Sequence, residues 1–473
     1  MRAWGLTQLC RAVARRAADR ATRIAGKRDG SCYNQPFSRA CVIARGTQIV
    51  MECGAAGRPA EAGGIQRAAR FMKMPSGTEH FGNARAMPPA LGARLEQFAF
   101  CFGQTYDSYL ATENDREYFW CRERRGVVAY YRWRKYLHIV GGLLAAEEDK
   151  DALLDDFQAF AAANRRHLTF YNLPREEADR LGRRGFQVTK CGEEPIIDLT
   201  TTSWSGRSYE WLRRQENYCR RQNVRWREVP HEEGDTVFRE RVVPELLEIS
   251  RQHIAGTVYG RELRFFEGQF SPLELRRRRL YIAETLAEAW GPEPSPGRIE
   301  AFAVCNPAAG GRLWAIETYR RRADAPRGVV PFLMLQTARQ LKAEGIERLS
   351  LSLCPALRCE QPLAGDSAIF RRGMTFWWNR MNWLFDFHGI YHFKSRFRPD
   401  FSERYVAALP RLTLRSMRSF MLLWGILEPT PLRLVQQLYR KWRRRHVRAS
   451  LAVPERENDE PRAGHREPTR AEV

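Results

Sequence analysis

The chain has 473 residues, of which 44% are hydrophobic and 11% aromatic, and this composition excludes a protein that is disordered throughout. A chain of this length is expected to form two or three domains. Lys and Arg number 78 against 55 Asp and Glu, which gives a formal net charge of +23. Such a charge favours an anionic partner, namely nucleic acid, an anionic membrane face or an anionic cofactor, although a merely solubilising surface is the alternative.

Cysteine spacing and apolar runs exclude further classes. The 11 cysteines are scattered without a Cys-x-x-Cys pair, which indicates reduced thiols rather than a disulfide framework. His and Cys residues do not have the spacing of zinc ligands, and we expect no metal site and no bound cofactor. No run reaches the roughly 18 to 20 apolar residues that span a bilayer, so we predict no transmembrane helix.

The N-terminal part divides into an extension and a first domain. Residues 1–90 show little periodicity, and we predict a poorly ordered basic extension. A first domain is predicted over residues 91–205. Its elements are strands at 118–121, 126–131, 137–140, 168–171 and 186–199, a helix over 147–164 with Leu153, Leu154, Phe157 and Phe160 at helical spacing, and a helical turn at 176–181.

A second domain with a similar pattern is predicted over residues 206–410. Its elements are helices at 211–222, 243–254, 272–290 and 331–343, and strands at 299–305, 312–319 and 346–353. Strands alternating with helices indicate an α/β (α+β) fold, here two tandem domains with mixed central sheets flanked by helices. Residues 411–448 read as a basic amphipathic helical segment, the form of an interfacial anchor on anionic lipid, with a helix packed on the core as the alternative. The tail over 449–473 is predicted to be disordered.

The loop at 320–328 is the first candidate for chemistry. It carries four arginines and ends at Gly328, directly before a helix whose N-terminus suits a phosphate or an oxyanion. The arrangement resembles the phosphate-binding turn of acyl-coenzyme A acetyltransferases, with a degenerate glycine spacing; a solvated basic loop is the alternative. Glu317, near the end of the preceding strand, could act as a general base or orient an amine, or could form a structural salt bridge with Arg320.

Two further segments combine basic and aromatic residues. In the segment 387–399 the two kinds of residue alternate, which suits stacking on a nucleobase or contact with phosphates, with an amphipathic strand as the alternative. The helix predicted over 211–222 is strongly basic and could lie along a polyanion or present a solvated face. His388 and His392 are four residues apart without a third ligand candidate nearby, so no metal is predicted there.

Successive blocks of the chain resemble the C-terminal catalytic domain of phosphatidylglycerol lysyltransferases, the lysyl-phosphatidylglycerol synthase family. The resemblance covers roughly residues 118–410. The blocks are Tyr171-Asn172-Leu173-Pro174, Leu181 to Phe186, Gly192 to Leu199, the basic helix within Gly206 to Tyr218, Glu317 to Arg320 with Asp324 to Val329, and Phe393-Lys394-Ser395-Arg396-Phe397-x-Pro399 followed by Arg404-Tyr405.

The resemblance implies a tandem acetyltransferase-like (GNAT-type) fold that moves an aminoacyl group, lysine or another, from aminoacyl-tRNA to a membrane phospholipid headgroup such as phosphatidylglycerol. It also implies a peripheral location on the inner face of the cytoplasmic membrane. The implied catalytic residues are Glu317, Arg320 and Lys394, and the implied substrate-binding residues are Glu193, Glu194, Arg213, Asn217, Arg327, Tyr391, Arg396 and Arg404.

The chain also departs from that family pattern. Val140-Gly141-Gly142 and Val330-Pro331 stand where the family usually has acidic residues, and the family's multi-span membrane domain is not found in this sequence. Two alternatives therefore stay open, an acyl-coenzyme A-dependent N-acyltransferase and a non-catalytic module that binds tRNA or anionic lipid.

Overall fold

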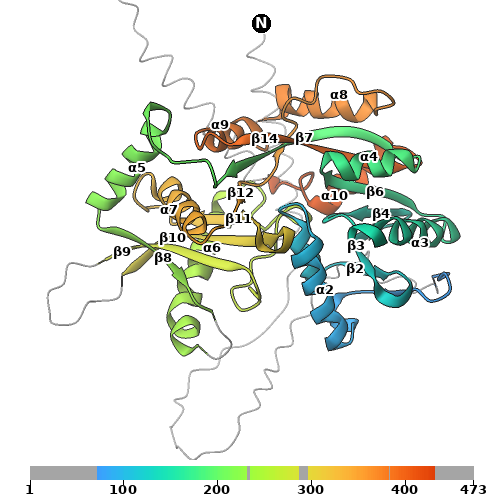
Figure 1. Cartoon of the computed structure of the whole chain (residues 1–473). Helices are drawn as coiled ribbons and strands as arrows, with labels where there is room; N and C mark the ends of the chain where they lie inside the picture. Colours follow the sequence, from blue (N-terminus) through green and yellow to red (C-terminus); the bar gives the residue numbers. More distant parts are fainter. Residues whose placement is uncertain (1–71, 232–234, 287–296, 383, 432–473) are drawn as a thin grey trace, which may run out of the picture. The chain divides into compact units, whose positions relative to one another are not determined.

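The computed structural model describes residues 72–231, 235–286, 297–382 and 384–431, and within them the strands form one mixed sheet (Figure 1). The order of the strands across the sheet is β1-β2-β3-β4-β6-β14-β7-β12-β11-β10-β9-β8, with β5 paired to β3 and β13 paired to β7. The strands of the first half are β1 (Glu79–Phe81), β2 (Glu117–Trp120), β3 (Gly126–Trp133), β4 (Tyr136–Ile139), β5 (Leu144–Ala145), β6 (His167–Leu173) and β7 (Gln187–Asp198). Those of the second half are β8 (Val224–Val229), β9 (Arg279–Thr285), β10 (Arg298–Ala308), β11 (Leu313–Arg321), β12 (Arg348–Ser350), β13 (Cys354–Pro355) and β14 (Asp400–Leu409).

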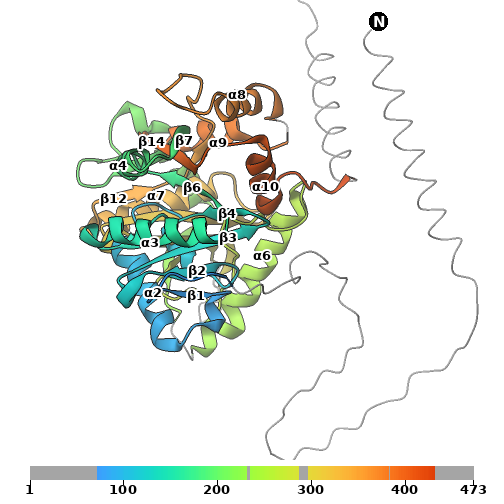
Figure 2. The same cartoon turned by 90° about the vertical axis from the view of Figure 1, so that its right-hand side faces the viewer.

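Helices cover both faces of this sheet (Figures 1 and 2). They are α2 (Pro89–Phe102), α3 (Lys150–Ala163), α4 (Arg175–Arg183), α5 (Glu210–Arg221), α6 (Val243–Gly256), α7 (Val329–Ala343), α8 (Ala368–Phe376), α9 (Phe387–Ser395) and α10 (Leu414–Trp424). A π-helical turn at Phe238–Val242 leads into α6, and another at Trp377–Met381 follows α8.

The layers follow from the alternation of side chains along each strand. On β2, Phe119 packs in a core with Phe157 of α3, whereas Tyr118 and Trp120 belong to a second core with Leu95 of α2. Successive strand residues point to opposite faces of a sheet, so a strand that is apolar throughout needs a helix on each side. The predicted α/β class, with a mixed sheet flanked by helices, is confirmed.

The two halves repeat one connection. Strands β4 and β6 are parallel and are joined through α3, and strands β11 and β12 are parallel and are joined through α7. A parallel pair needs such a crossover, whereas the remaining neighbours along the sheet are antiparallel. The predicted domain boundary at residues 205/206 stays a prediction.

Strand β14 joins the halves. It lies at the end of the second predicted domain, yet it pairs with β6 on one side and β7 on the other. Tyr405, for example, is opposite Leu173 of β6 and Lys190 of β7. The sheet therefore crosses the predicted boundary without a break.

Two sequence-based predictions of local structure need correction. The helix predicted over 272–290 is wrong within the described residues, because 279–285 form β9; residues 287–290 lie outside the described part. Leu280 to Ala283 are fully buried between β8 and β10, and a short apolar run does not distinguish a buried strand from a buried helix. The segment 387–395 is a helix, α9, and not an amphipathic strand.

The predicted extension over 1–90 is too long, because β1 begins at residue 79 and α2 at Pro89; residues 1–71 lie outside the described part of the chain. At the other end, α10 covers 414–424, whereas residues 432–448 of the predicted anchor and the tail at 449–473 are not described. Phe420, Trp424 and Ile426 of this segment are buried, which agrees with the alternative of a helix packed on the core. Among the described residues no helix is long and apolar enough to cross a bilayer.

Candidate functional site

A cavity of about 520 Å³ opens where the end of β11 meets the segment after α6, α9 and the end of α10. Its walls carry the three residues predicted to be catalytic, Glu317, Arg320 and Lys394. Two residues that we had not predicted, Tyr106 and Glu267, line the same space. The fold therefore brings Glu317 and Arg320 at the end of β11 together with Lys394 of α9 around one cavity.

A β-bulge directs β11 into this cavity. Val304 of β10 is opposite Thr318, while the next residue, Cys305, is opposite Ile316, so Glu317 is the extra residue on β11. A bulge changes which side chains of a strand face a given side of the sheet, and such bulges are common beside active sites. Ile316 packs in the core beneath α7, and beyond the bulge Thr318 and Arg320 line the cavity.

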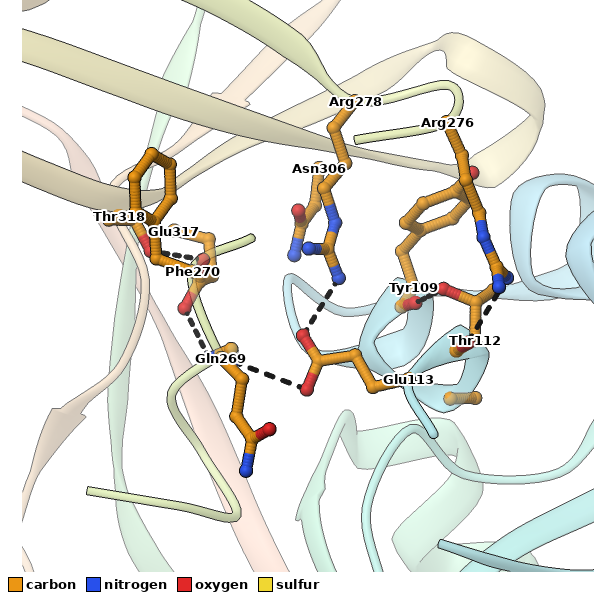
Figure 3. A network of polar contacts seen from close by, with 12 residues as sticks. Tyr109, Thr112, Glu113, Gln269, Phe270, Arg276, Arg278, Asn306, Glu317 and Thr318 are labelled. Carbon is orange, nitrogen blue, oxygen red and sulfur yellow. Dashed lines mark hydrogen bonds and ion pairs between the residues drawn. The ribbon is translucent and has the colours of Figure 1, made fainter. Parts of the chain in front are cut away.

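Glu317 is held by two short hydrogen bonds (Figure 3). The backbone N–H of Gly268 donates to its Oε1 over 2.7 Å, and the hydroxyl of Thr318 donates to its Oε2 over 2.5 Å. Burial raises the pKa of this carboxyl, although Arg278 and both hydrogen bonds oppose the rise. Glu317 is thus a fixed carboxylate at the wall of the cavity.

A second carboxylate fixes the same loop from the other side (Figure 3). Glu113 accepts a hydrogen bond from the backbone N–H of Gln269 over 3.3 Å. It also forms an ion pair with Arg278 over 2.9 Å. Arg116, whose side chain is fully buried, donates to Glu113 over 3.2 Å. The backbone N–H groups that follow Glu267 are therefore clamped by Glu317 and Glu113, and the position of Glu267 in the cavity is fixed through its backbone.

Glu267 forms no hydrogen bond or ion pair among the described residues, and the residue is exposed to the solvent of the cavity. Desolvation by the surrounding protein, followed by the like charge of Glu317, raises the pKa of Glu267 to about 7, while Arg320 and Lys394 act against the rise. A carboxylate with a pKa near neutrality can take a proton and return it in one reaction cycle. Sequence reasoning missed this residue, and its only local signal is a carboxylate between Phe266 and Gly268.

The two cations of the cavity are held differently. Arg320 donates to the hydroxyl of Ser250, forms an ion pair with Glu262 over 2.8 Å and lies over the ring of Phe270 at 5.4 Å. The Lys394 ammonium donates to the carbonyls of Ser352 and Leu353 over 3.0 and 3.1 Å. An ammonium has three donors, so one N–H of Lys394 is left for a ligand.

Burial lowers the pKa of Lys394, and the nearby Cys354, Glu194 and Glu267 counteract that effect. The Lys394 side chain is 5% exposed, so its remaining donor points from a nearly dry position towards the cavity. Hydrogen bonds from charged donors are strongest in such surroundings.

Changing Glu267 to Gln is expected to stabilise the protein only at high pH. Because the pKa of Glu267 is higher in the folded protein than in the unfolded chain, the folded state binds this proton more tightly. The associated stability is present below about pH 4.5 and is lost as the pH rises through about 7. Melting temperatures of the two proteins should agree at pH 4 and separate by pH 8, with the variant higher; equal melting temperatures at both values would contradict the raised pKa.

Three other predicted substrate-binding residues lie in the sheet and do not line the cavity. Glu193 accepts from Lys190 over 2.6 Å and from Arg358 over 2.8 Å. Glu194, which is fully buried, accepts from Arg404 over 2.7 Å, and Ser350 also donates to it. These contacts connect β7 with β14 and β12, and they indicate structural roles.

Replacing Arg404 by Leu is expected to lower the free energy of unfolding by about 3 to 5 kcal/mol, because it leaves the Glu194 carboxylate charged and unpaired inside the sheet. Denaturant titration measures this effect. The matched control is Arg175→Leu, which removes an exposed ion pair with Glu403 and should cost no more than about 1 kcal/mol. If Arg404→Leu were as stable as the wild type but had lost transfer activity, Arg404 would be a substrate-binding residue rather than a structural one.

Of the remaining predicted residues, Arg213, Asn217, Arg327 and Arg396 lie on or beside α5, whereas Tyr391 lies on α9 away from it. The Arg396 guanidinium lies over the ring of Trp211 at 4.8 Å, so α9 contacts α5. Arg213 donates to the carbonyls of Trp204 and Gly206, and this fixes the turn before α5. Asn217 and Arg327 are exposed, and Tyr391 packs between the rings of Trp378 and Phe401. Further exposed arginines on these elements are Arg207, Arg214, Arg220, Arg221, Arg225 and Arg398.

No group of three or more His, Cys, Asp or Glu side chains in the described ranges is arranged to hold a metal ion.

Comparison with known proteins assigns the chain to a family. The family model for the C-terminal part of phosphatidylglycerol lysyltransferases matches residues 102–408. The chain belongs to this family. A phosphatidylglycerol lysyltransferase of Bacillus subtilis is 23% identical over 322 residues, which cover 66% of this chain and 34% of that protein. One from Staphylococcus epidermidis is 21% identical over 305 residues, again covering 34% of the relative.

Solved structures of the lysyltransferase family share the fold. The C-terminal domain of a protein described as a lysylphosphatidylglycerol synthetase from Agrobacterium fabrum has a TM-score of 0.57 at 20% identity, covering 72% of this chain and 99% of that one. The structure of L-PGS from Bacillus licheniformis also has a TM-score of 0.57, at 21% identity and with coverages of 72% and 97%. The chain therefore spans about a third of the curated relatives and nearly the whole of these solved lysyltransferase-family domains.

Proposed function

We propose that this protein transfers an aminoacyl group, lysine or another, from aminoacyl-tRNA to a hydroxyl of a phospholipid headgroup such as phosphatidylglycerol. The observation that carries the proposal is the cavity in which an unpaired carboxylate, Glu267, faces a fixed carboxylate, Glu317, and the buried ammonium of Lys394. Membership of the phosphatidylglycerol lysyltransferase family supports the same chemistry.

In the proposed step the lipid hydroxyl oxygen attacks the carbonyl carbon of the aminoacyl ester, and Glu267 takes the hydroxyl proton. Lys394 donates its remaining N–H to the oxyanion that forms, as a positioned donor in a dry site stabilises such charge. The bond between the carbonyl carbon and the terminal ribose oxygen of the tRNA then breaks, and Glu267 returns its proton to that oxygen. One ester replaces another, so no nucleotide hydrolysis is needed.

Glu317 and Arg320 have supporting roles in this scheme. The fixed carboxylate of Glu317 is suited to receive the ammonium group of the aminoacyl donor, and its charge also keeps the pKa of Glu267 near 7. Arg320 already has three partners, so it acts mainly by holding the cavity wall and by offering positive charge to a phosphate.

The donor tRNA is proposed to contact the surface around α5 that contains Arg213, Asn217, Arg327 and Arg396, and to extend to Tyr391 of α9. Exposed arginines there can neutralise the phosphates of the tRNA. The acceptor places the protein at a membrane, and we propose a peripheral location on the cytoplasmic face.

A coenzyme A-dependent N-acyltransferase is less favoured, because the N-terminus of α7 is covered. A Cβ atom at Gly328 would meet the side chain of Gln215 from α5, and the first residue of the helix, Val329, is fully buried. A pyrophosphate needs open backbone N–H groups at this position. A non-catalytic module that binds tRNA or anionic lipid is the second alternative.

The experiment uses purified full chain, a pool of aminoacyl-tRNAs labelled on the amino acid, and vesicles that contain phosphatidylglycerol. Label is followed into the chloroform-soluble fraction. Label that moves into lipid supports the proposal, and the donating tRNA names the amino acid. Binding of tRNA and vesicles without any transfer would favour the non-catalytic alternative, and transfer from acetyl-coenzyme A to an amine would favour the other.

A further inference from the structure

A second groove, of about 570 Å³, lies between the β3–β4 hairpin and α10. Its walls are mainly apolar, and its rim is basic. The residues that line it are Trp133, Arg134, Lys135 and Tyr136 of the hairpin, and Arg415, Arg418, Ser419 and Leu422 of α10. These two segments are almost 300 residues apart in the chain. The α10 residues lie within the segment 411–448 that was predicted as an anchor on anionic lipid, whereas the hairpin residues were not part of any predicted site.

The orientation of α10 is fixed by its opposite face. Phe420 stacks on Tyr171 with ring centroids 4.4 Å apart, and the hydroxyl of Ser419 shares a hydrogen bond of 2.9 Å with His138 of β4. With this face buried, Leu414 is left 68% exposed, and Arg415 and Arg418 are exposed as well. Arg415 and Arg418 of α10 therefore lie beside the hairpin and remain in solvent.

The hairpin presents its charges at the tip. Trp133 and Tyr136 are joined by a two-residue turn in which Arg134 has a φ of 53°, a conformation that Asn or Gly adopts more readily. Arg134 and Lys135 are exposed, and the guanidinium of Arg166 in the neighbouring turn donates to the carbonyl of Arg134. A positively charged side chain therefore occupies a position where the backbone geometry favours a small residue.

The charges around the groove are uncompensated. Among the described residues no ion pair involves Arg134, Lys135, Arg415 or Arg418. Helix α10 contains no Asp or Glu. Many other arginines of the chain do have carboxylate partners, for example Arg132, directly before Trp133 on β3, with Glu117 of β2. Four unpaired cations around an apolar groove complement a surface that is both anionic and apolar.

We propose that this groove docks the protein on an anionic phospholipid surface, with the ring of Trp133 and the side chains of Leu414 and Leu422 at the depth of the headgroups. The inference rests on the proposed lipid acceptor and adds the site of contact. Aromatic residues beside cations are typical of membrane interfaces, where each basic residue strengthens binding to anionic lipid. RNA would gain little from exposed Leu414, and the surface around α5 carries more exposed arginines than the groove does.

Helix α10 contributes residues both to this groove and to the cavity that contains Glu267. Helix α10 has 11 residues, a length of about 16 Å, and its last residue, Trp424, lines the cavity that contains Glu267 and Lys394. One end of a single helix therefore lies at the proposed membrane contact and the other at the reaction site.

The test compares Arg134→Glu/Lys135→Glu and Trp133→Ala with the intact chain in sedimentation with vesicles of equal parts phosphatidylglycerol and phosphatidylcholine. The charge variant is expected to bind at least about tenfold more weakly. The matched control is Arg183→Glu/Arg348→Glu, which reverses two exposed cations on α4 and β12 and should bind like the wild type. Circular dichroism and melting temperature establish that each variant folds.

A second measurement separates docking from catalysis. Transfer to a short-chain, water-soluble phosphatidylglycerol should be unchanged in the groove variants, while transfer to vesicles falls in proportion to binding. Equal vesicle binding by wild type, groove variants and control would overturn the inference, as would loss of tRNA binding rather than vesicle binding in the charge variant. If the wild-type protein binds vesicles but transfers no aminoacyl group to any acceptor, the proposed function is overturned and the docking surface is still supported.

Discussion

Replacing Glu267 by Gln is expected to lower the rate of aminoacyl transfer by about 10²- to 10⁴-fold, the usual contribution of a general base. In the wild type the rate should rise as the pH increases through about 7, because the carboxylate must lose its proton before it can accept one from the lipid hydroxyl. The variant should lack this rise. Steady-state transfer measured between pH 5.5 and pH 8.5 provides both readings.

A matched control exists seven residues further along the chain. Glu274 is exposed and lies outside the cavity, so Glu274→Gln should keep both the rate and the pH profile of the wild type. A Glu267→Gln variant that retains the wild-type rate would remove Glu267 from the mechanism and leave Glu317 as the remaining candidate base.

The variant Glu317→Gln is expected to weaken binding of the aminoacyl donor and to shift the pH profile to lower values. The side chain loses the charge that would receive the donor ammonium, so KM for aminoacyl-tRNA should rise. Removing that charge also removes a cause of the raised pKa of Glu267, so the midpoint of the rate profile should fall below 7. A rise in KM of about tenfold or more would correspond to one hydrogen-bonded ion pair.

These two variants distinguish the roles of the carboxylates. If Glu317 were the base, Glu317→Gln would abolish the dependence of the rate on pH instead of shifting it. A deacylated tRNA should bind Glu317→Gln and the wild type equally, because it carries no aminoacyl ammonium, and unequal binding would point to damage in the tRNA surface.

The sequence predicted the elements well where a periodic pattern was long. The helix containing Leu153, Phe157 and Phe160 and the strand–helix–strand unit over 312–353 were both found. Strand β9 was missed because its buried residues are apolar without alternation, and only the pairing with β8 and β10 determines its conformation.

The site was predictable only in part, for reasons of register. Glu317, Arg320 and Lys394 were found through local motifs, but the bulge that places Glu317 in the cavity depends on the pairing of β10 with β11. Arg404 has the residue type of a phosphate ligand, yet its partner Glu194 is 210 positions away in the sequence. Glu267 belongs to no motif, and its unusual pKa arises from groups supplied by other elements.

The insertion of β14 between β6 and β7 has a consequence for biosynthesis. A ribosome that has released only the first 205 residues has produced β6 and β7 but not the strand that separates them, so each exposes an unpaired edge. The central sheet can close only after residue 409 has emerged. A fragment cut between the two predicted domains should therefore aggregate during expression, and the smallest expressible unit should run from the start of β1 to the end of α10, which covers Tyr171 and His138.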